Sequence, residues 1–272
     1  MVLCMDERNG IPAALMPSRV PVVSGIAWLD DLDALSTVHA GTVSLALSRM
    51  AGVFTECRAM LDPLEHGLGI PADRLHFVTL GIDEEHFRPS AEPPIADRVF
   101  SVGDDRMRDY DTLVAALHQV RDHRPTLTAE VATTLPVNLP EEWSTIHRRR
   151  MDHAVRGCYQ NASVVALALE STPHGSGLTV ILEAMASARP LVVTDNPGLS
   201  DYVEHGVTGL LVPQGSPGAM AEAVESLLAD PDRAAAMGRA ARARVEEQFT
   251  TKHMAADLDR VLRSAVEGRQ TS

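Results

Sequence analysis

The chain has 272 residues, enough for one large domain or two modest ones, and its hydrophobic and charged fractions of 45% and 22% are ordinary for a globular protein. A net charge of −13 argues against electrostatic binding to nucleic acid or to an anionic membrane surface over a broad area. No apolar run approaches the ~18 residues that span a bilayer. Three cysteines without CxxC spacing, Cys4, Cys57 and Cys158, predict neither a disulfide framework nor a zinc site, so a reducing cytoplasm is the expected setting.

Before residue 84 the sequence alternates short apolar runs with candidate helices. Strands are predicted at residues 2–5, 19–23, 52–55 and 75–78, and helices at residues 44–50 and 58–66. Between the first two strands, the run Asn9-Gly10-Ile11-Pro12 predicts a loop and a turn, because glycine and proline interrupt regular structure. Residues 84–97 are polar and rich in proline, which makes them the best linker candidate in the chain.

After the linker candidate, strands and helices alternate more regularly. Strands are predicted at residues 99–102, 127–132, 163–169, 190–194 and 209–212. Helices are predicted at residues 109–120, 199–204, 216–229, 232–247 and 252–266, and residues 141–161 read as largely helical. This alternation predicts βαβ units around a parallel sheet, whose ligands bind beyond the carboxyl ends of the strands. The turns at residues 104–108 and 170–177 both follow strands, so they could line one crevice.

The glycine-rich turn at residues 170–177 is the most informative stretch of the chain. An abrupt helix follows it, with an apolar stripe formed by Leu178, Ile181, Leu182 and Met185. The first N–H groups of a helix lack internal partners, and glycines before it let a phosphate approach the backbone, so an anion site is predicted there. Thr179 and Glu183 share a neighbouring face, where Glu183 could accept hydrogen bonds from sugar hydroxyls. The alternative is an ordinary βα turn with a solvated glutamate.

Several segments in the same order resemble family 4 glycosyltransferases, also described as glycosyl transferase group 1, which have the GT-B fold. The matching segments are GSGLTVILEAMA at residues 175–186, RPLVVT at 189–194, GLSDYV at 198–203 and HGVTGLLVP at 205–213, with GIP at 69–71, GID at 81–83 and FRP at 87–89 before them. The resemblance covers roughly residues 50–265. As an ordered set these motifs are specific, although each alone is weak.

The resemblance implies an α/β protein of GT-B type with two Rossmann-like parallel-sheet domains. Residues 1–88 would form a truncated N-terminal, acceptor-side domain, because such domains usually need ~100–150 residues. Residues 89–250 would form a complete C-terminal domain that binds a nucleotide sugar, and residues 251–272 a helix that crosses back toward the first domain. Three explanations of the short first domain stay open: a truncated gene model, a natural remnant, or half of a split enzyme that a partner chain completes.

The resemblance also assigns site residues. Gly177, Leu178 and Thr179 would cradle the donor diphosphate, Glu183 would hold ribose hydroxyls, Arg106 or Arg108 would neutralise phosphate, and His174, Gly175 and Ser176 could contact the donor sugar. The alternatives are plain helix capping for Thr179, a surface ion pair with Asp109 or Asp111 for Arg108, and a solvent-exposed loop position for His174. Trp28, Asp30 and Asp31 are weaker candidates for facing an acceptor.

Two positions depart from the family pattern. The family often carries two glutamates separated by seven residues; Glu183 is the second, and Gly175 stands where the first belongs. The usual arginine directly after Gly103 is replaced by Asp104. The contacts with the donor sugar and with the phosphate therefore cannot be copied from the family pattern at these two places.

The leading functional hypothesis is transfer of a sugar from a nucleotide-diphosphate sugar to an unknown acceptor hydroxyl, with retention of configuration. It needs no cofactor and no bound metal. The alternative is a non-catalytic nucleotide-sugar-binding remnant or subunit of a split glycosyltransferase. A third reading, a sugar-nucleotide epimerase of GT-B shape, is less favoured by the helix after the glycine-rich turn and by the GLLVP strand. The sequence identifies neither the base, the sugar nor the acceptor.

Overall fold

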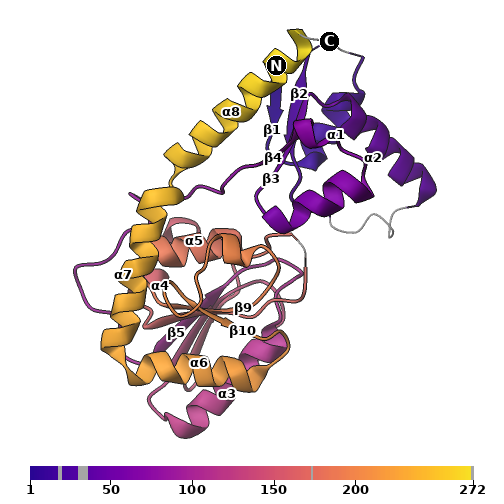
Figure 1. Cartoon of the computed structure of the whole chain (residues 1–272). Coiled ribbons are helices and arrows are strands. Elements are labelled where there is room, and N and C mark those ends of the chain that lie inside the picture. The colour runs from indigo at the N-terminus through magenta and orange to yellow at the C-terminus, as the bar shows by residue number, and fades with distance from the viewer. Residues whose placement is uncertain (18–19, 30–35, 173, 271–272) are drawn as a thin grey trace. The chain divides into compact units, whose positions relative to one another are not determined.

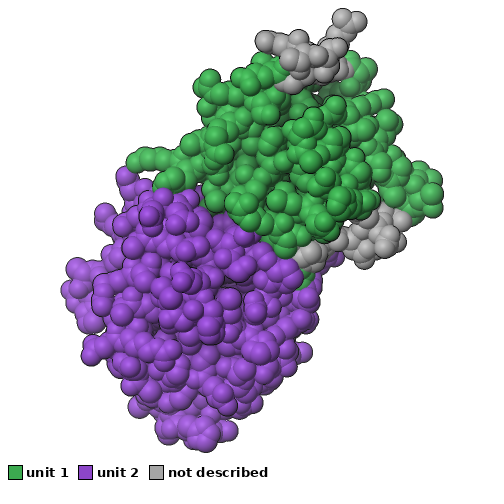
Figure 2. Space-filling view, viewed as in Figure 1, with its two compact units in different colours: residues 1–80, 172–175, 252–272 green, residues 81–171, 176–251 purple. Residues whose placement is uncertain are grey.

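A computed structural model describes residues 1–17, 20–29, 36–172 and 174–270. Contacts divide the chain into two compact units, shown in different colours in Figure 2. Unit 1 comprises residues 1–80, 172–175 and 252–272, and unit 2 comprises residues 81–171 and 176–251. The domain boundaries expected from the sequence, after residues 88 and 250, stay predictions. Among the described residues, no helix is both long and apolar enough to cross a membrane.

Unit 1 is a four-stranded parallel sheet with helices on both faces (Figure 1). Its strands, β1 (Val2–Cys4), β2 (Val22–Gly25), β3 (Gly52–Thr55) and β4 (Leu75–Phe77), pair in sequence order. Its longer helices are α1 (Glu7–Leu15), α2 (Thr37–Arg49) and α8 (Thr251–Gln270), and short helices span Arg58–Met60, Pro63–Gly67 and Ala72–Arg74. The predicted strands of this region are therefore confirmed, to within a few residues at their ends.

The two faces of the unit 1 sheet pack against different helices. Successive strand residues point to opposite faces. Val22 and Val53 pack in a cluster with Val43 and Leu47 of α2. The next residues along the same two strands, Val23 and Phe54, pack instead with Val261 and Ala265 of α8. Unit 1 therefore consists of three layers, and its outer layer on one side is a helix from the other end of the sequence.

The predicted loop at residues 9–12 is wrong, because these residues lie inside α1. The Asp6 side chain caps this helix by accepting a hydrogen bond from the Asn9 backbone N–H at 3.2 Å. Gly10 is there for close packing, since a Cβ at that position would lie 1.9 Å from Ser24 Oγ on β2. The glycine marks the close approach of helix and strand, and the helix tolerates Pro12 inside it.

Unit 2 is a six-stranded parallel sheet in the order β10-β9-β8-β5-β6-β7. Its strands are β5 (Arg98–Val102), β6 (Thr128–Ala132), β7 (Ser144–His147), β8 (Val164–Leu167), β9 (Leu191–Thr194) and β10 (Leu210–Val212). Its helices are α3 (Tyr110–His123), α4 (Val155–Asn161), α5 (Leu178–Ala186), α6 (Pro217–Ala229) and α7 (Pro231–Gln248), with short helices at Asp152–Ala154 and Leu199–Asp201. The sheet order reverses between β8 and β5, where the first strand of the unit meets the fourth.

The core of unit 2 lies between this sheet and α3 and α6. Val99 of β5 and Val164 of β8 pack there with Leu117 of α3 and Val224 of α6. On the opposite face, Phe100 packs edge-on against Tyr159 of α4, with ring centroids 5.0 Å apart. The sheet is therefore buried on both faces, with α3 and α6 on one side and α4 on the other.

The prediction of a largely helical segment at residues 141–161 is wrong. Residues Ser144–His147 form the edge strand β7, which pairs with β6 from Ala129 to Ala132. Pairing with a partner far along the chain overrides the weak helical pattern. Only Val155–Asn161 is α-helical, and the residues between these two elements form a short connection.

Candidate functional site

The start of α5 differs from the starts of the other long helices of unit 2. Side chains accept a backbone N–H at the first turns of α3, α6 and α7, from Asp109, Ser216 and Asp230. α5 instead begins at Gly177, which has φ +85° and provides no side-chain cap. Its first backbone N–H groups are thus left available to an external anion, as the sequence predicts for this turn.

Beside this helix start lies the guanidinium of Arg108, which is enclosed by two glycines. A Cβ on Gly103 would lie 2.2 Å from Arg108 Nε, and a Cβ on Gly177 would lie 3.1 Å from Arg108 NH1. Both nitrogens are buried, and neither makes a hydrogen bond with any described residue. Burial lowers the pKa of Arg108, although Tyr110 and Asp105 oppose this effect. A buried guanidinium with two unpaired nitrogens beside a helix N-terminus is an arrangement that fits a phosphate group.

The two turns that follow β5 and β8 are held together by hydrogen bonds. The Glu170 backbone N–H donates to the Met107 carbonyl at 2.8 Å, and Arg108 and Leu169 form an antiparallel bridge. The Ser176 hydroxyl donates to Asp105 Oδ2 at 2.6 Å. The expectation that these turns line one place is therefore confirmed. These contacts also explain how Arg108, six residues after the end of β5, reaches the start of α5.

Glu183 lies in the second turn of α5 and is oriented by a buried tyrosine. The hydroxyl of Tyr159 donates to Glu183 Oε2 at 2.6 Å, and Tyr159 itself is fully buried between Phe87 and Phe100. Burial raises the pKa of Glu183, while this hydrogen bond and the charge of Arg108 lower it. One carboxylate oxygen is thus fixed by the protein, and the other is left to accept hydrogen bonds from a ligand.

Glu183 also lines a cavity of about 520 Å³ within unit 2. The same cavity is lined by Arg149, Arg150, Met151 and His153, from the connection between β7 and α4. Carboxylate, cationic and thioether side chains therefore face one space that is large enough for a nucleoside. Arg149 and Arg150 are exposed to solvent, and they also line this cavity.

The remaining predicted residues fall into different environments. Arg106 and Thr179 are exposed, Leu178 and Ser176 are buried, and Gly175 is half-buried. His174 is only 3% exposed and its ring lies 5.4 Å from that of Trp28, so the solvent-exposed alternative for this histidine is wrong. Asp30, Asp31 and Pro173 lie outside the described residues.

Asp104, which stands at the position of the family's arginine, is engaged elsewhere. Its Oδ1 accepts hydrogen bonds from the backbone N–H of Thr134 at 2.5 Å and from the hydroxyls of Thr133 and Thr134. These bonds lower the pKa of Asp104, so the carboxylate is charged. Asp104 therefore fixes the turn after β5 to the loop after β6, and it leaves Arg108 as the buried cation of this turn.

Sequence reasoning missed Tyr159 and the role of Asp105. Tyr159 is 24 positions before Glu183, and Asp105 is 71 positions before Ser176, so no local spacing connects either pair. The only available signal was composition, since a tyrosine in a chain with 4% aromatic residues usually has a specific environment.

The chain is similar in sequence to known proteins. Residues 137–244 match the family model described as glycosyl transferases group 1. The chain is 30% identical over 226 residues to alpha-maltose-1-phosphate synthase of Mycolicibacterium smegmatis, and 29% identical over 224 residues to a GDP-mannose-dependent alpha-(1-6)-phosphatidylinositol monomannoside mannosyltransferase of Mycobacterium tuberculosis. Each match covers 71% of this chain, but only 58% and 57% of the two relatives, so the chain spans little more than half of their lengths.

Solved structures show the same fold. The sucrose-phosphate synthase of Thermosynechococcus elongatus aligns with a TM-score of 0.82 at 19% identity, covering 98% of this chain and 74% of that one. The Anabaena protein HepE, solved in complex with UDP and glucose, aligns with a TM-score of 0.80 at 18% identity over 96% of this chain and 77% of that one. The α/β fold of GT-B type predicted from the sequence is confirmed. The match to the family model and the sequence relatives identify residues 137–244 as part of a group 1 glycosyltransferase domain.

Proposed function

We propose that this chain transfers a sugar from a nucleotide-diphosphate sugar to an acceptor hydroxyl, with retention of configuration at the sugar. The observation that carries the proposal is the Arg108 guanidinium, buried beside the uncapped start of α5 and with two nitrogens that are unpaired among the described residues. The match to the family model and the names of the curated relatives support the class of reaction. Because the chain spans just over half of those relatives, the activity of the whole protein stays a proposal.

In the proposed reaction the helix start and Arg108 bind the leaving diphosphate. Negative charge develops on the phosphate oxygen as its bond to the sugar breaks. The N–H groups of Gly177, Leu178 and Thr179, together with the fixed guanidinium, stabilise that charge without having to reorganise. This supply of positive charge is the reason why the proposed transfer needs no bound metal. His174, Gly175 and Ser176 remain proposed contacts for the donor sugar, and Arg106, being exposed, is the less favoured phosphate ligand.

The nucleoside part of the donor would occupy the cavity next to Glu183. With one oxygen of its carboxylate held by Tyr159, Glu183 would accept hydrogen bonds from ribose hydroxyls with the other. Arg149, Arg150 and Met151 would then face the base. Both GDP-linked and UDP-linked chemistry occur among the similar proteins, so the base is a question for experiment.

A second candidate function is donor binding without independent catalysis, by a subunit that acts with a partner chain. The exposed edge of unit 1 favours it: β1 is the outermost strand, and Val2 and Leu3 on it are 39% and 38% exposed. Met1 and Met5 beside them are exposed as well. An apolar sheet edge of this kind is a surface on which another strand can pair.

Isothermal titration calorimetry with UDP-glucose, GDP-mannose and ADP-glucose tests donor binding. We expect one of the three to bind, and Glu183→Ala to weaken that binding about 10- to 100-fold, since hydrogen bonds to a charged carboxylate contribute about 1.5–3 kcal/mol. Glu222→Ala, at an exposed position of α6, is the matched control and should bind like the wild type. The absence of binding by the wild type to any nucleotide sugar would contradict both candidate functions.

Product analysis then separates the two candidates. An active transferase should convert the bound donor to free nucleoside diphosphate in the presence of acceptor sugars or lipids. A donor-binding subunit should bind the same donor with unchanged affinity and release no nucleoside diphosphate on its own. Donor binding and turnover are therefore measured on the same preparation, so that an inactive but folded protein is recognised by its binding.

A further inference from the structure

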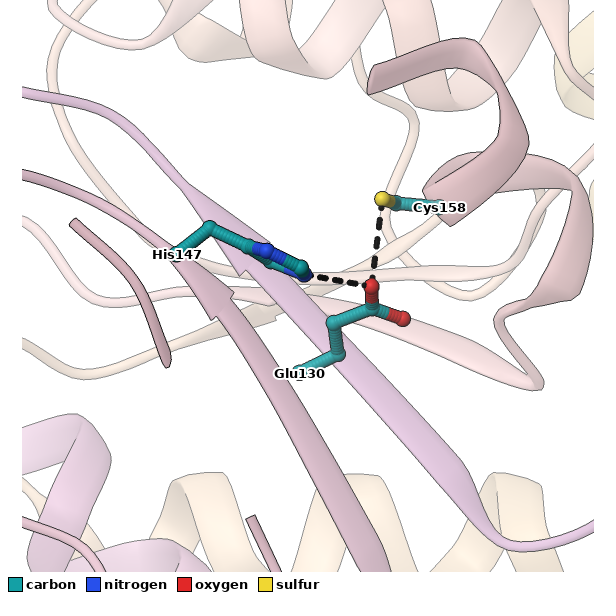
Figure 3. A group of neighbouring side chains, drawn as sticks. All are labelled: Glu130, His147 and Cys158. Carbon is teal, nitrogen blue, oxygen red and sulfur yellow. Dashed lines mark hydrogen bonds and ion pairs between the residues drawn. The ribbon is translucent and has the colours of Figure 1, made fainter. Parts of the chain in front are cut away.

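Three side chains with different ligand atoms meet on the α4 side of the unit 2 sheet (Figure 3). Glu130 lies on β6, His147 on β7 and Cys158 on α4, and their ligand atoms lie within 4.8 Å of one another. His147 Nε2 is 2.8 Å from Glu130 Oε1, and Cys158 Sγ donates to the same oxygen at 3.2 Å. Imidazole and thiol thus converge on one carboxylate oxygen.

The sheet register explains this convergence. Glu130 pairs with Thr145, and His147 lies two residues further along β7, so Glu130 and His147 point to the same face. Cys158 comes down on this face from the middle of α4. The thiol is buried at 6% exposure, whereas the side chain of His147 is 25% exposed. The group therefore has a buried end and a side that solvent can reach.

The second carboxylate oxygen of Glu130 forms an ion pair with an arginine on the neighbouring strand. Arg98 NH1 on β5 lies 3.3 Å from Glu130 Oε2. This ion pair turns the other oxygen, Oε1, toward His147 and Cys158. Ligating carboxylates in metal sites are commonly anchored in this way through their free oxygen. Arg98 thus fixes the orientation of the carboxylate without competing for the oxygen that faces the cluster.

The three ligand types fit one zinc ion, two of their separations are close to zinc geometry, and the third, between nitrogen and sulfur, is within 4.8 Å. Sulfur, imidazole nitrogen and carboxylate oxygen are the three ligand types of zinc sites. With Zn–N and Zn–O near 2.0 Å and Zn–S near 2.3 Å, tetrahedral ligand atoms lie about 3.3–3.5 Å apart. The N–O and S–O separations of 2.8 and 3.2 Å differ from this by about half an ångström or less, which side-chain rotation can supply.

We propose that Glu130, His147 and Cys158 bind one Zn²⁺, with water at the fourth position. Binding would release the Cys158 thiol proton to solvent, and the neutral His147 imidazole would carry its proton on Nδ1, which leaves Nε2 free to bind the metal. The cysteine spacing alone predicts no zinc site. The sequence does not reveal this one because Glu130 and Cys158 are 28 positions apart. The ligands become neighbours only through the pairing of β6 with β7 and the packing of α4.

The position of the site gives the metal a structural role. His147 and Cys158 bracket residues 148–157, and this segment carries Arg149, Arg150 and His153, which line the cavity beside Glu183. A metal bound to both ends would close this segment into a short loop and restrict its motion. Zn²⁺ binding itself does not depend on the proposed donor site, so it can be tested separately.

Titration of the metal-free protein with Co²⁺ tests the site, because thiolate bound to Co²⁺ gives a sulfur-to-cobalt charge-transfer band in the near ultraviolet. We expect one equivalent to produce the band and Zn²⁺ to abolish it by displacement. Cys158→Ala should lose the band, and both Cys158→Ala and His147→Ala should bind Zn²⁺ at least about 100-fold more weakly. Cys57→Ala removes another buried thiol, in unit 1, and should leave the band unchanged.

A wild-type protein that shows no band, or a band that persists in Cys158→Ala, would overturn the proposal. Circular dichroism shows whether each variant is folded, and Glu130→Gln provides an independent variant that should weaken Zn²⁺ binding if the cysteine variant unfolds. Hydrogen exchange tests the structural role. Amides of residues 148–157 should exchange more slowly with Zn²⁺ in the wild type, whereas unchanged exchange in the metal-bound protein would rule out the loop restriction.

Discussion

Arg108 is held by close packing against glycines, and its Nε and NH1 donate no hydrogen bond to the described residues. A buried cation without a partner destabilises a fold, because it has lost its hydration. Positions that reduce stability in this way are common where a ligand supplies the missing interactions. The same side chain should therefore affect stability and binding in opposite directions.

Replacing Arg108 by methionine tests this opposition. Arg108→Met should weaken nucleoside diphosphate binding about 10- to 100-fold, as expected for loss of a charged hydrogen bond of about 1.5–3 kcal/mol. In the absence of ligand the variant should be as stable as the wild type or more stable. Calorimetric binding and denaturant unfolding measure the two effects. Arg106→Met, at an exposed position of the same turn, should change neither quantity; a larger binding loss there would contradict the assignment of Arg108.

Gly177 provides a second test at the start of α5. A Cβ there would lie 2.8 Å from Leu167 Cδ2, and the backbone has φ +85°. Gly177→Ala should therefore destabilise unit 2 by about 1–3 kcal/mol, through a strained backbone and a displaced neighbour. Gly157 in α4 has open space around it and ordinary helical geometry, so Gly157→Ala should stabilise by about 0.5–1 kcal/mol. Denaturant unfolding measures the free energy of unfolding, which should fall in Gly177→Ala and rise in Gly157→Ala.

Glu56, directly after β3, gives a prediction about pH. Burial raises its pKa from 4.5 to about 7. The folded protein thus binds this proton more tightly than the unfolded chain, so its contribution to stability is complete below pH 4.5 and is lost as the pH rises through 7. The loss is on the order of 3 kcal/mol. Glu56→Gln, which resembles the protonated acid, should stabilise at pH 8 and have little effect at pH 5 in chemical unfolding. Equal effects at both values would contradict the raised pKa.

Single residues of the site were predictable to different degrees. Gly177 and Glu183 stand in a contiguous motif with a local physical reason, so their positions at and inside α5 followed from the sequence. Arg108 and Arg106 could not be distinguished, because only the fold shows which of them is buried. Tyr159 was missed, since its partner Glu183 is 24 positions away and the contact exists only after α4 and α5 pack on one sheet.

Among the elements, predictions succeeded where the local pattern and the fold agree. The buried strands β3, β8 and β9 are short apolar runs bounded by turns, and each lies within the predicted range. Helix α1 was missed because Gly10 and Pro12 resemble turn signals, although Gly10 serves contact with β2. Strand β7 was missed because its four residues acquire their conformation from pairing with β6.

Helix α7 holds the segment before β5 through a single arginine. Arg242 NH1 lies 2.8, 2.9 and 2.8 Å from the carbonyl oxygens of Glu84, Phe87 and Ala186. Arg242→Met would leave these acceptors without their donor and should destabilise unit 2 by about 3 kcal/mol. Arg239→Met, one turn earlier and exposed, should stay within about 0.5 kcal/mol of the wild type. Faster hydrogen exchange at residues 84–88 in Arg242→Met alone would verify the contact.

At the level of the whole molecule, the class of fold was predictable and its strand order was not. Alternating strands and helices imply parallel sheets, and the sheets are parallel throughout the described strands. The position of β8 beside β5 depends on which strand edges remain free after β5, β6 and β7 have paired. That is a property of the assembled sheet, so no local pattern in the sequence encodes it.

Each unit has a core of its own, which predicts that they can be disrupted separately. Val261 of α8 is 4% exposed and packs with Val23, Phe54 and Val78, whereas Val266 on the same helix is 46% exposed. Val261→Asp buries a charge and should destabilise unit 1 by about 3–5 kcal/mol, while Val266→Asp should be nearly neutral. Hydrogen exchange should show fast exchange in β2 and β3 and retained protection in β5 and β8. Loss of protection in both units together would contradict separate cores.

The packing of α8 on the sheet of unit 1 also determines the order in which the protein can mature during translation. Residues 81–251, which include all of unit 2, emerge from the ribosome before the helix that covers Val23 and Phe54 has been synthesised. At about 5–20 residues per second, strands β2 and β3 are synthesised roughly ten seconds or more before α8, which packs on them. Throughout that interval the nascent chain presents an apolar sheet face, a substrate for chaperones, and it can bury this face only after α8 has been synthesised.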